Sequence, residues 1–292
     1  LVLRPDAIGD YVLFRDYLGW IRRHSPWRDW KIVLVGNRTW RDLAEYFDKD
    51  CYDAAVWFDR RRVARNPFAL VALYRRVRRL GASCALYPVL SREFLLGDMI
   101  VRASGAPRRI GTVADCVNMT PREARRGDKW YTELVTVPAR GFEFERTAAF
   151  FRGLCSGARD LPPRPSLTVP GSRAALPPEI VAAKNIVAIF PGAGDARRRW
   201  PVERFCAVAA RLAASGRRVV ACGGVMDRAA TGRIAAASGG IDAGGILGWP
   251  AQVALVARAR IVITNDSCPL HLAVACAVPV VWPRYFKRPV AD

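Results

Sequence analysis

The residues best suited to chemistry follow an apolar run at 261–264. Asp266, Ser267 and His271 bring a carboxylate, a hydroxyl and one of only two histidines into one loop and one helical turn. A β-branched run that stops at polar residues and then resumes as an apolar segment predicts a strand, a tight loop and a helix. Such a junction turns a helix N-terminus toward the carboxyl edge of a parallel sheet, where anionic ligands bind. The loop therefore indicates a pyrophosphate site, although helix capping and a half-buried structural histidine explain these residues equally well.

A second candidate is the stretch 191–199, in which Pro-Gly-Ala-Gly precedes a run of three arginines. Small residues after a strand let backbone N–H groups approach phosphates, and arginines add charge-assisted, bidentate hydrogen bonds. No Gly-Lys-Ser/Thr follows, so this is not a Walker loop. A phosphate site and a surface loop with solvated arginines are equally good interpretations of this segment alone.

A third candidate lies near the start of the chain, where the strand-like residues 1–4 lead to Gly9 and Asp10. Gly9 permits an unusual backbone angle, and Asp10 opens the predicted helix. Helix capping is the commoner use of an Asp in this place. A carboxylate at the carboxyl edge of the first strand can also serve as a general base. The dinucleotide fingerprint G-x-G-x-x-G is absent here.

Two further acidic segments are weaker candidates. Asp227 follows Gly223-Gly224 at another predicted strand end, where it could reach a ribose hydroxyl, and a lone Asp there is more often a helix cap. Asp48-Lys49-Asp50 has the D-x-D spacing of some metal and nucleotide-sugar sites. Because it follows a predicted helix and precedes Cys51-Tyr52-Asp53, a charged turn is the better interpretation.

Composition limits the class of protein. The chain has 292 residues, half of them hydrophobic, and a formal net charge of +20. It is long enough for two globular domains, and no apolar run approaches the ~20 residues of a membrane-spanning helix. The eight cysteines are scattered without a C-x-x-C pair, so we expect reduced thiols in a cytoplasmic protein. With two histidines, a histidine-based metal site is not expected. The missing initiator Met and the end at 284–292, without a closing helix, suggest trimming at both termini.

The positive charge is carried mainly by arginine and fits three kinds of partner: nucleic acid, an anionic membrane surface or an acidic small substrate. Part of the excess reflects a sequence rich in Ala, Arg and Gly throughout. No RNA-binding aromatic motif, zinc-finger spacing or basic leucine zipper accompanies it, so a nucleic-acid partner is not expected. Attraction to an anionic membrane is the better use of the charge, with solvated helix faces as the default.

Strand and helix patterns alternate almost from end to end, which predicts βαβ units and parallel sheets with helices on both faces. A Pro-, Ser- and Gly-rich stretch at 161–180 is the candidate linker between two doubly wound α/β domains, 1–165 and 166–292, with a cleft between them. The predicted strands are 1–4, 31–35, 54–58, 83–88, 185–190, 218–222, 261–264 and 278–282; the predicted helices are 10–23, one through Leu43 and Tyr46, 68–80, 203–215, 251–259, and two that begin at Asp227 and Pro269.

Taken in order, the motifs form a series. It runs from Arg4-x-x-x-x-Gly9-Asp10, through Pro191-Gly192-Ala193 with Arg198-Arg199-Trp200-Pro201 and Arg204-Phe205, to Asn265-Asp266-Ser267-Cys268-Pro269-Leu270-His271-Leu272-Ala273. The series resembles that of glycosyltransferase family 9, the lipopolysaccharide heptosyltransferases, whose blocks read R-x-x-x-x-G-D, P-G-A with K-R-W-P and R-F, and N-D-S-G-P-M-H-L-A. Between residues 51 and 161 the similarity is mainly one of pattern.

The resemblance implies a GT-B architecture of two Rossmann-like domains and inverting, metal-independent sugar transfer from a nucleotide sugar, often ADP-heptose. Residues 1–165 would bind the acceptor and 166–292 the donor. The family's catalytic Asp falls on Asp10, and its phosphate-binding Lys falls on Arg198, which keeps the cation and adds bidentate reach. The other positions implied in donor binding are Gly9, Ala193, Gly194, Asp227 at the ribose, Leu247 at the base, Asp266, Ser267, Cys268 and His271.

One position departs from the family. Cys268 stands where the family usually has Gly, and if that position needs a positive backbone angle, Cys costs about 1 kcal/mol or more. We expect a cytoplasmic glycosyltransferase, peripheral on the inner membrane, that uses a nucleotide-sugar donor and a glycolipid acceptor and needs no cofactor. The alternative is a non-catalytic nucleotide-sugar or glycolipid binder on the same scaffold. A nucleic-acid binder rests on charge alone.

Overall fold

The computed structural model describes residues 1–155, 157–169 and 176–283. The chain divides into two compact units, Leu1–Arg164 and Pro165–Asp292, called unit 1 and unit 2 below. The division lies beside the predicted boundary between residues 165 and 166. Part of the predicted linker, at 170–175, and the expected trimmed end at 284–292 lie outside the described residues.

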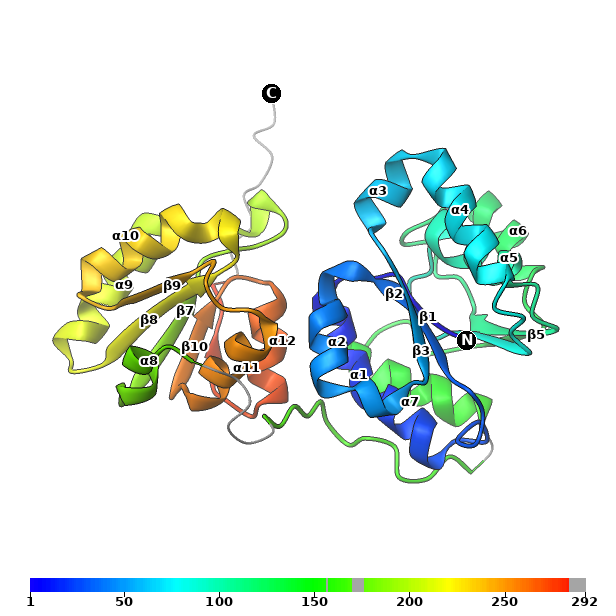
Figure 1. Cartoon of the computed structure of the whole chain (residues 1–292), viewed down its shortest axis with the longest axis horizontal. Helices are drawn as coiled ribbons and strands as arrows, with labels where there is room; N and C mark the ends of the chain where they lie inside the picture. Colours follow the sequence, from blue (N-terminus) through cyan, green and yellow to red (C-terminus); the bar gives the residue numbers. More distant parts are fainter. Residues whose placement is uncertain (156, 170–175, 284–292) are drawn as a thin grey trace. The chain divides into compact units, whose positions relative to one another are not determined.

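Unit 1 is a parallel sheet with helices on its faces, drawn from blue to green in Figure 1. The strand order is β3-β2-β1-β4-β5-β6, and every pairing is parallel. The strands are β1 (Val2–Arg4), β2 (Val33–Asn37), β3 (Ala54–Phe58), β4 (Cys84–Tyr87), β5 (Arg108–Thr112) and β6 (Glu133–Val135). The helices are α1 (Ile8–His24), α2 (Arg41–Phe47), α3 (Arg60–Arg65), α4 (Pro67–Arg78), α5 (Met99–Ser104), α6 (Pro121–Asp128) and α7 (Glu143–Leu154).

Unit 2 repeats this plan with five parallel strands in the order β11-β10-β7-β8-β9. The strands are β7 (Ile186–Phe190), β8 (Arg218–Gly223), β9 (Ile241–Gly244), β10 (Ile261–Thr264) and β11 (Val280–Val281). The helices are α8 (Pro178–Ala182), α9 (Val202–Ala214), α10 (Arg228–Ser238), α11 (Trp249–Arg258) and α12 (Cys268–Ala275). The central strand β7 is apolar and buried along its whole length, because helices cover both of its faces.

Each sheet contains a point where the chain reverses its direction of strand addition. In unit 1 this point lies between β1 and β4, and in unit 2 between β7 and β10. The loops that follow two such strands diverge toward opposite faces of the sheet and leave a crevice at its carboxyl edge. The α/β class with two doubly wound parallel sheets is therefore confirmed, and each unit has a natural place for a ligand.

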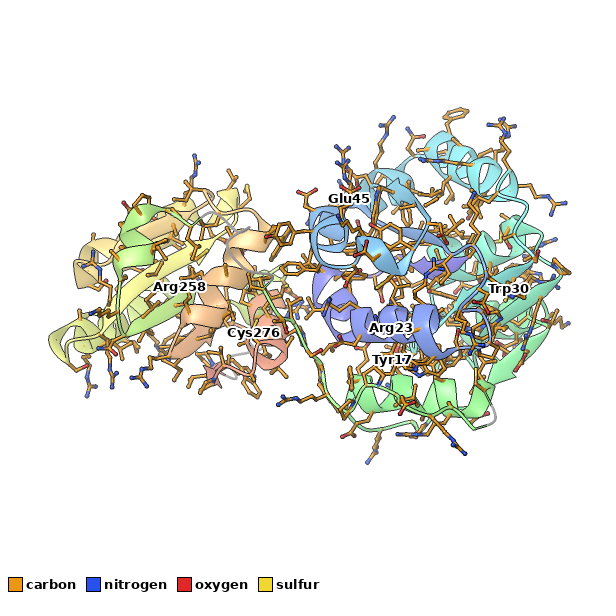
Figure 2. The ribbon with its side chains drawn as sticks, turned by 60° about the horizontal axis from the view of Figure 1, so that its bottom comes forward. Tyr17, Arg23, Trp30, Glu45, Arg258 and Cys276 are labelled. Carbon is orange, nitrogen blue, oxygen red and sulfur yellow. The ribbon has the colours of Figure 1, made fainter. Side chains whose placement is uncertain are left out.

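Aromatic side chains join the helices of unit 1 to each other. Tyr17 of α1 is labelled in Figure 2. Its hydroxyl donates a hydrogen bond to the Phe144 carbonyl of α7 at 2.6 Å, and its ring stacks on Phe151. The Trp20 indole N–H donates to the Arg159 carbonyl at 2.8 Å. Helix α7 is thereby fixed against α1, and its first residue, Glu143, is held near the carboxyl edge of the sheet.

Several predicted elements differ from those in the structure. The first helix begins at Ile8 rather than at residue 10. Strands β5, β6 and β9 and helices α3, α5, α6 and α7 were missed. The sequences of β6 and β9, Glu-Leu-Val and Ile-Asp-Ala-Gly, are too short to show alternation. The predicted linker overlaps the start of helix α8, whose first residue is Pro178. The Asp48 segment is more than a charged turn, since the Asp48 carboxylate is buried against Arg15 at 2.6 Å and the Tyr11 hydroxyl at 2.7 Å.

Candidate functional site

A cleft of about 830 Å³ opens at the carboxyl edge of the unit 1 sheet. Its walls come from the segments that follow β1 to β6, so the fold itself creates it. Asp10 lines the cleft together with the polar or charged residues Asp6, Asn37, Thr39, Asp59, Arg60, Arg61, Ser91, Glu93, Asn118, Glu143 and Arg146. The cleft therefore mixes carboxylates and guanidinium groups, which suits a polar, hydroxyl-rich ligand.

Asp10 is the third residue of α1 rather than its N-cap. The N-cap is Ala7, and the Asp10 carboxylate reaches back to accept a hydrogen bond from the Ala7 backbone N–H at 3.1 Å. Gly9 lies inside the helix and does not take a positive backbone angle, so the unusual angle expected there is wrong. The helix starts early because the Asp10 carboxylate satisfies a backbone donor that the first turn leaves unpaired. One oxygen of the carboxylate is thus oriented and the residue stays on the wall of the cleft.

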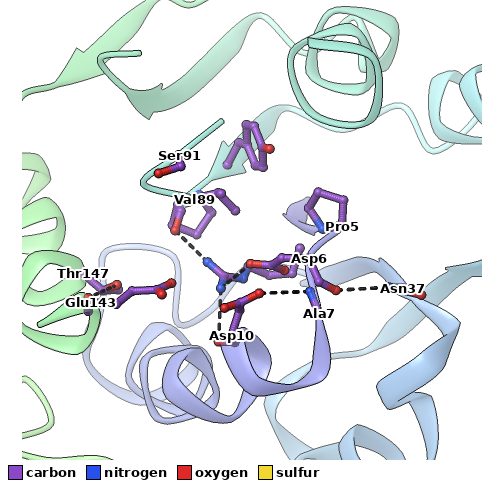
Figure 3. Close-up of polar contacts among 12 residues, drawn as sticks. Pro5, Asp6, Ala7, Asp10, Asn37, Val89, Ser91, Glu143 and Thr147 are labelled. Carbon is purple, nitrogen blue, oxygen red and sulfur yellow. Dashed lines mark hydrogen bonds and ion pairs between the residues drawn. The ribbon is translucent and has the colours of Figure 1, made fainter. Parts of the chain in front are cut away.

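A buried arginine, Arg4, organises the loop that leads to Asp10; Figure 3 shows Asp6 and Ala7 of this loop beside Asp10. The Arg4 guanidinium, 1% exposed, pairs with the Asp6 carboxylate at 2.6 Å. It also donates to the Pro88 carbonyl at 2.8 Å and to the Asp10 carbonyl at 3.2 Å, and it lies 4.3 Å from the ring centroid of Phe14. Arg4 therefore ties the loops after β1 and β4 together at the crevice between these strands.

Asp6 is the most perturbed carboxyl of the cleft. Burial raises the pKa of Asp6 to about 7, and the nearby charges of Asp10 and Glu143 act in the same direction against Arg4. Among the described residues, the Asp6 Oδ1 atom is buried and has no hydrogen-bond partner. Burial also raises the pKa of Glu143. A carboxyl group that changes charge near neutral pH thus lies beside the predicted base, as is common at catalytic sites.

The cleft also has a basic side. The Arg60 guanidinium donates to the Pro5 carbonyl at 3.2 Å and pairs with Glu93 at 2.6 Å. Arg61 and Arg146 lie on the same walls. These contacts hold the start of α3 at the rim, next to the loop that carries Asp10.

In unit 2 the first and second candidate loops, at 266–271 and 191–199, meet at the crevice between β7 and β10. The Arg198 guanidinium lies 3.3 Å from the Asp266 carboxylate, and both side chains are partly exposed. The two residues are 68 positions apart in the sequence, and the pairing of β7 with β10 brings them together. The predicted phosphate-binding cation is therefore placed at the carboxyl edge of the sheet.

Asn265 fixes the geometry of both loops. It is completely buried, its amide N–H donates to the Pro191 carbonyl at 2.6 Å, and its oxygen accepts from the Trp200 N–H at 3.0 Å. Arg199 adds a hydrogen bond from its Nε to the Ala193 carbonyl at 2.9 Å. The turn at 191–200 is therefore held in place by hydrogen bonds, which weakens its interpretation as a loose surface loop.

Helix α12 starts at this crevice with Ser267 as its N-cap. The Ser267 hydroxyl lies 3.3 Å from the Thr264 hydroxyl and does not cap the helix amides. Pro269 has no N–H, and the Leu270 N–H is bonded to the Ser267 carbonyl at 3.0 Å, so the row of amides expected for a phosphate is reduced. Cys268 has no positive backbone angle, and the strain considered for it does not arise. His271, half-buried, lies one residue beyond Leu270 in the first turn.

Asp227 packs against the loop after β7. Its carboxylate accepts a hydrogen bond from the Gly224 N–H at 2.9 Å, and a Cβ at Gly192 would lie 2.5 Å from the same carboxylate. Leu247 is buried, and its carbonyl accepts from the Gln252 side chain at 2.9 Å. A second cleft of about 430 Å³ includes Asp227 and Pro191 on its walls. Arg198, Asp266 and His271 do not line this cleft.

Comparison with known protein families gives a match in the C-terminal part of the chain. Residues 147–282 match the family model described as glycosyltransferase family 9 (heptosyltransferase). They form a glycosyltransferase family 9 domain. The match over these residues confirms the resemblance seen in the motifs and supports the prediction of an enzyme, a glycosyltransferase. No match is found among curated proteins.

Solved structures extend the similarity beyond the family 9 domain. A glycosyl transferase family 9 structure from Veillonella parvula DSM 2008 is 18% identical, with a TM-score of 0.74 over 96% of this chain and 79% of that one. The E. coli ADP-heptose lps heptosyltransferase II is 18% identical, with a TM-score of 0.67 over 96% and 83%. E. coli heptosyltransferase WaaC with ADP-2-deoxy-2-fluoro heptose is 16% identical, with a TM-score of 0.70 over 96% and 87%. These similarities show a shared fold, that of the GT-B heptosyltransferase structures.

Some site residues were not found from the sequence. Asp6 had a usable signal, since it is a carboxylate in the same strand-end loop as Asp10. Asn265 was part of a motif, but its role depends on Pro191 and Trp200, which are far away in the sequence. Glu143 had no signal, because only the packing of α7 brings it to the cleft.

Proposed function

We propose that the protein transfers a heptose or a similar sugar from an ADP-linked donor to a lipopolysaccharide-type glycolipid, with inversion at the anomeric carbon and without a metal. The observation that carries the donor side is the Arg198–Asp266 pair at 3.3 Å, at the crevice of the family 9 domain. Similar folds have been solved with ADP and with an ADP-heptose analogue, which supports an ADP-linked donor.

In the proposed reaction Asp10 takes the proton of the acceptor hydroxyl. The hydroxyl oxygen forms a bond to the anomeric carbon of the donor while the bond from that carbon to the diphosphate oxygen breaks. The proton ends on the Asp10 carboxyl group and the electron pair on the leaving ADP. The hydrogen bond from the Ala7 N–H orients Asp10, and the Asp6 carboxyl changes the charge around it near neutral pH.

Arg198 is suited to stabilise the leaving diphosphate. An ion pair between partly exposed side chains is worth only about 0–1 kcal/mol, so a diphosphate can replace Asp266 as the partner of Arg198. The positive charge then meets the negative charge that grows as the bond breaks, which lowers the barrier. His271, Ser267 and Cys268 would lie around the diphosphate and sugar, with Ala193, Gly194 and Gly9 adding backbone groups. Asp227 would contact the ribose and Leu247 the base.

The proposed reaction uses no resident metal. Within the described residues, no group of three or more His, Cys, Asp and Glu side chains is arranged to hold a metal ion. We therefore expect transfer to continue in EDTA, whereas loss of transfer in EDTA and its return with Mg²⁺ would contradict metal independence.

Unit 1 is the proposed acceptor-binding part, because its cleft carries Asp10 and the guanidinium groups of Arg60, Arg61 and Arg146. Guanidinium groups favour an acceptor with phosphate or carboxylate groups. None of the described helices is long and apolar enough to cross a membrane. We place the reaction at the cytoplasmic face of the inner membrane, where such a glycolipid would be exposed.

The test compares wild type with Asp10→Asn. Transfer is assayed with a panel of ADP-, UDP- and GDP-sugars, and the anomeric configuration of the product is determined by NMR. We expect Asp10→Asn to lower kcat by about 10²- to 10⁴-fold while ADP binding is retained. The control is Asp29→Asn, which removes the same charge from an exposed position of unit 1. Full turnover by Asp10→Asn would reject the proposed base.

The same assay tests the alternative, a non-catalytic binder. Tight ADP binding by wild type without transfer to any acceptor would favour that alternative. The ordinary backbone angle of Cys268 removes one argument for it.

A further inference from the structure

Helices α3 and α4 form an unusually basic stretch of unit 1, drawn in cyan in Figure 1. Between residues 60 and 79 the sequence contains eight arginines and no acidic residue. They are Arg60, Arg61, Arg62, Arg65, Arg75, Arg76, Arg78 and Arg79. Arginine side chains packed this densely repel one another unless an anionic surface is near.

Apolar side chains are exposed on the same stretch. Phe68 is 84% exposed and Val71 43%. Buried Leu73 and Val77 mark the inward side of α4. At 100° per residue, positions 68, 71, 72, 75 and 79 fall on the opposite side, so the outward stripe of α4 holds Phe68, Val71 and Ala72 together with Arg75 and Arg79. Helix α4 thus presents an apolar and a basic group together to solvent.

A neighbouring loop enlarges the apolar part. Leu95 is 51% exposed, and its carbonyl accepts a hydrogen bond from the Tyr74 hydroxyl of α4 at 2.9 Å. We call the exposed residues Arg62, Arg65, Phe68, Val71, Arg75, Arg79 and Leu95 the α3–α4 surface. In the described part of the chain, the arginines of this surface have no carboxylate partner within ion-pair distance.

The α3–α4 surface continues into the wall of the unit 1 cleft. Arg60 and Arg61, at the start of α3, line the cleft, and the Arg60–Glu93 pair at 2.6 Å fixes the helix there. The next residue, Arg62, is exposed and belongs to the surface. A ligand held at this surface is therefore beside the opening that leads to Asp10.

We propose that the α3–α4 surface docks on a bilayer of anionic phospholipids, with Phe68, Val71 and Leu95 inserted at the headgroup level and the arginines on the phosphates. Amphipathic helices bind such interfaces through buried apolar area together with basic charge, and both are present on α4. The proposal rests on the proposed function only in that the docked bilayer would also hold the glycolipid acceptor beside the cleft.

The first experiment measures sedimentation of the full chain with vesicles, in the absence of donor and acceptor. Vesicles of phosphatidylglycerol and phosphatidylcholine are compared with pure phosphatidylcholine at low and high salt. We expect salt-sensitive binding to the anionic vesicles only. Phe68→Ser should weaken it about tenfold, and each of Arg75→Gln and Arg79→Gln about fivefold.

Matched controls come from unit 2. Met226→Ser removes another exposed apolar side chain, 90% exposed, and Arg211→Gln with Arg217→Gln removes two exposed arginines. These controls should leave vesicle binding within twofold of wild type. Thermal unfolding of every variant confirms that the exposed substitutions leave the fold intact.

Three results would overturn the proposal. Wild type could fail to bind anionic vesicles, the α3–α4 variants could bind them as well as wild type does, or the unit 2 controls could lose as much vesicle binding as the α3–α4 variants. Binding of duplex DNA through these arginines, without vesicle binding, would overturn it in favour of nucleic acid. Transfer to a soluble acceptor fragment distinguishes the two proposals, because the α3–α4 variants should retain it and Asp10→Asn should lose it. Asp10→Asn should in turn bind vesicles as wild type does.

Discussion

The contact between Gly192 and Asp227 gives the sharpest prediction for the donor side. A Cβ at residue 192 would lie 2.5 Å and 2.6 Å from the two carboxylate oxygens of Asp227 and 2.7 Å from its Cγ. Gly192→Ala must therefore displace this carboxylate, which accepts a hydrogen bond from the Gly224 N–H at 2.9 Å. Gly194 is two residues away in the same loop, and a Cβ there would meet nothing within 4 Å.

The cost follows from these distances. Overpacking by one methyl group typically costs about 1–3 kcal/mol, and the loss of a charge-assisted hydrogen bond falls in the same range. We expect Gly192→Ala to lower the free energy of unfolding by about 1–3 kcal/mol, which is about 2–4 °C in Tm per kcal/mol. ADP binding should weaken as much as in Asp227→Ala, because both changes remove the carboxylate from its place. Gly194→Ala should match wild type in both measurements.

A double-mutant cycle isolates the contact. The three atoms nearest to the added Cβ all belong to the Asp227 carboxylate. In an Asp227→Ala background, Gly192→Ala should therefore cost less than about 0.5 kcal/mol in thermal or urea unfolding. The reasoning is refuted if Gly192→Ala has the Tm and the ADP affinity of wild type. It is also refuted if Gly192→Ala lowers the free energy of unfolding as much in the Asp227→Ala background as in wild type.

Three further predictions concern single side chains. Asn265→Leu removes the partners of the buried Pro191 carbonyl and of the partly buried Trp200 N–H, so the free energy of urea unfolding should fall by about 2–5 kcal/mol, and an unchanged midpoint would contradict this role. Arg198→Ala should weaken ADP binding about 10- to 100-fold in calorimetry and Arg198→Lys less, whereas wild-type affinity in Arg198→Ala would exclude the phosphate contact. The pKa of Asp6 is about 7 in the folded protein against 3.8 ordinarily, so the folded state binds the proton more tightly. Its contribution to stability is therefore complete below about pH 4 and lost as the pH rises through 7, and Asp6→Asn should remove this decline from unfolding curves measured between pH 4 and 8.

The alternation of strands and helices could be predicted from the sequence because each pattern is local. The range 54–58 was predicted to the residue as β3, and 261–264 as β10, since apolar β-branched or aromatic runs there stop at polar residues. Strands β5, β6 and β9 were missed, and α1 was predicted to start two residues too late. Short strands contain too few residues to show an alternation of apolar and polar side chains. The start of α1 depends on the Asp10 carboxylate, which accepts a hydrogen bond from the Ala7 N–H.

The family was also evident from the sequence, because its motifs are short segments that each follow a strand. Their positions at the carboxyl edges then followed from the parallel topology. The sequence alone therefore assigns Asp10, Arg198 and Asp266 to loops that follow strands. It does not assign their partners, since a motif specifies residue types but not the side chains that packing brings against them.

The sequence alone therefore determined the α/β class, the glycosyltransferase family and the loops that carry its motifs, because each depends on residues that are close in the chain. The tertiary structure decided that Arg198 meets Asp266, that Gly192 packs on Asp227, and that Arg4 pairs with Asp6 and bonds to the Asp10 carbonyl. These contacts join side chains from different strand-end loops or bury them, and burial is what moves the pKa of Asp6 toward neutrality. Local patterns do not encode burial by distant segments, so only the folded chain shows it.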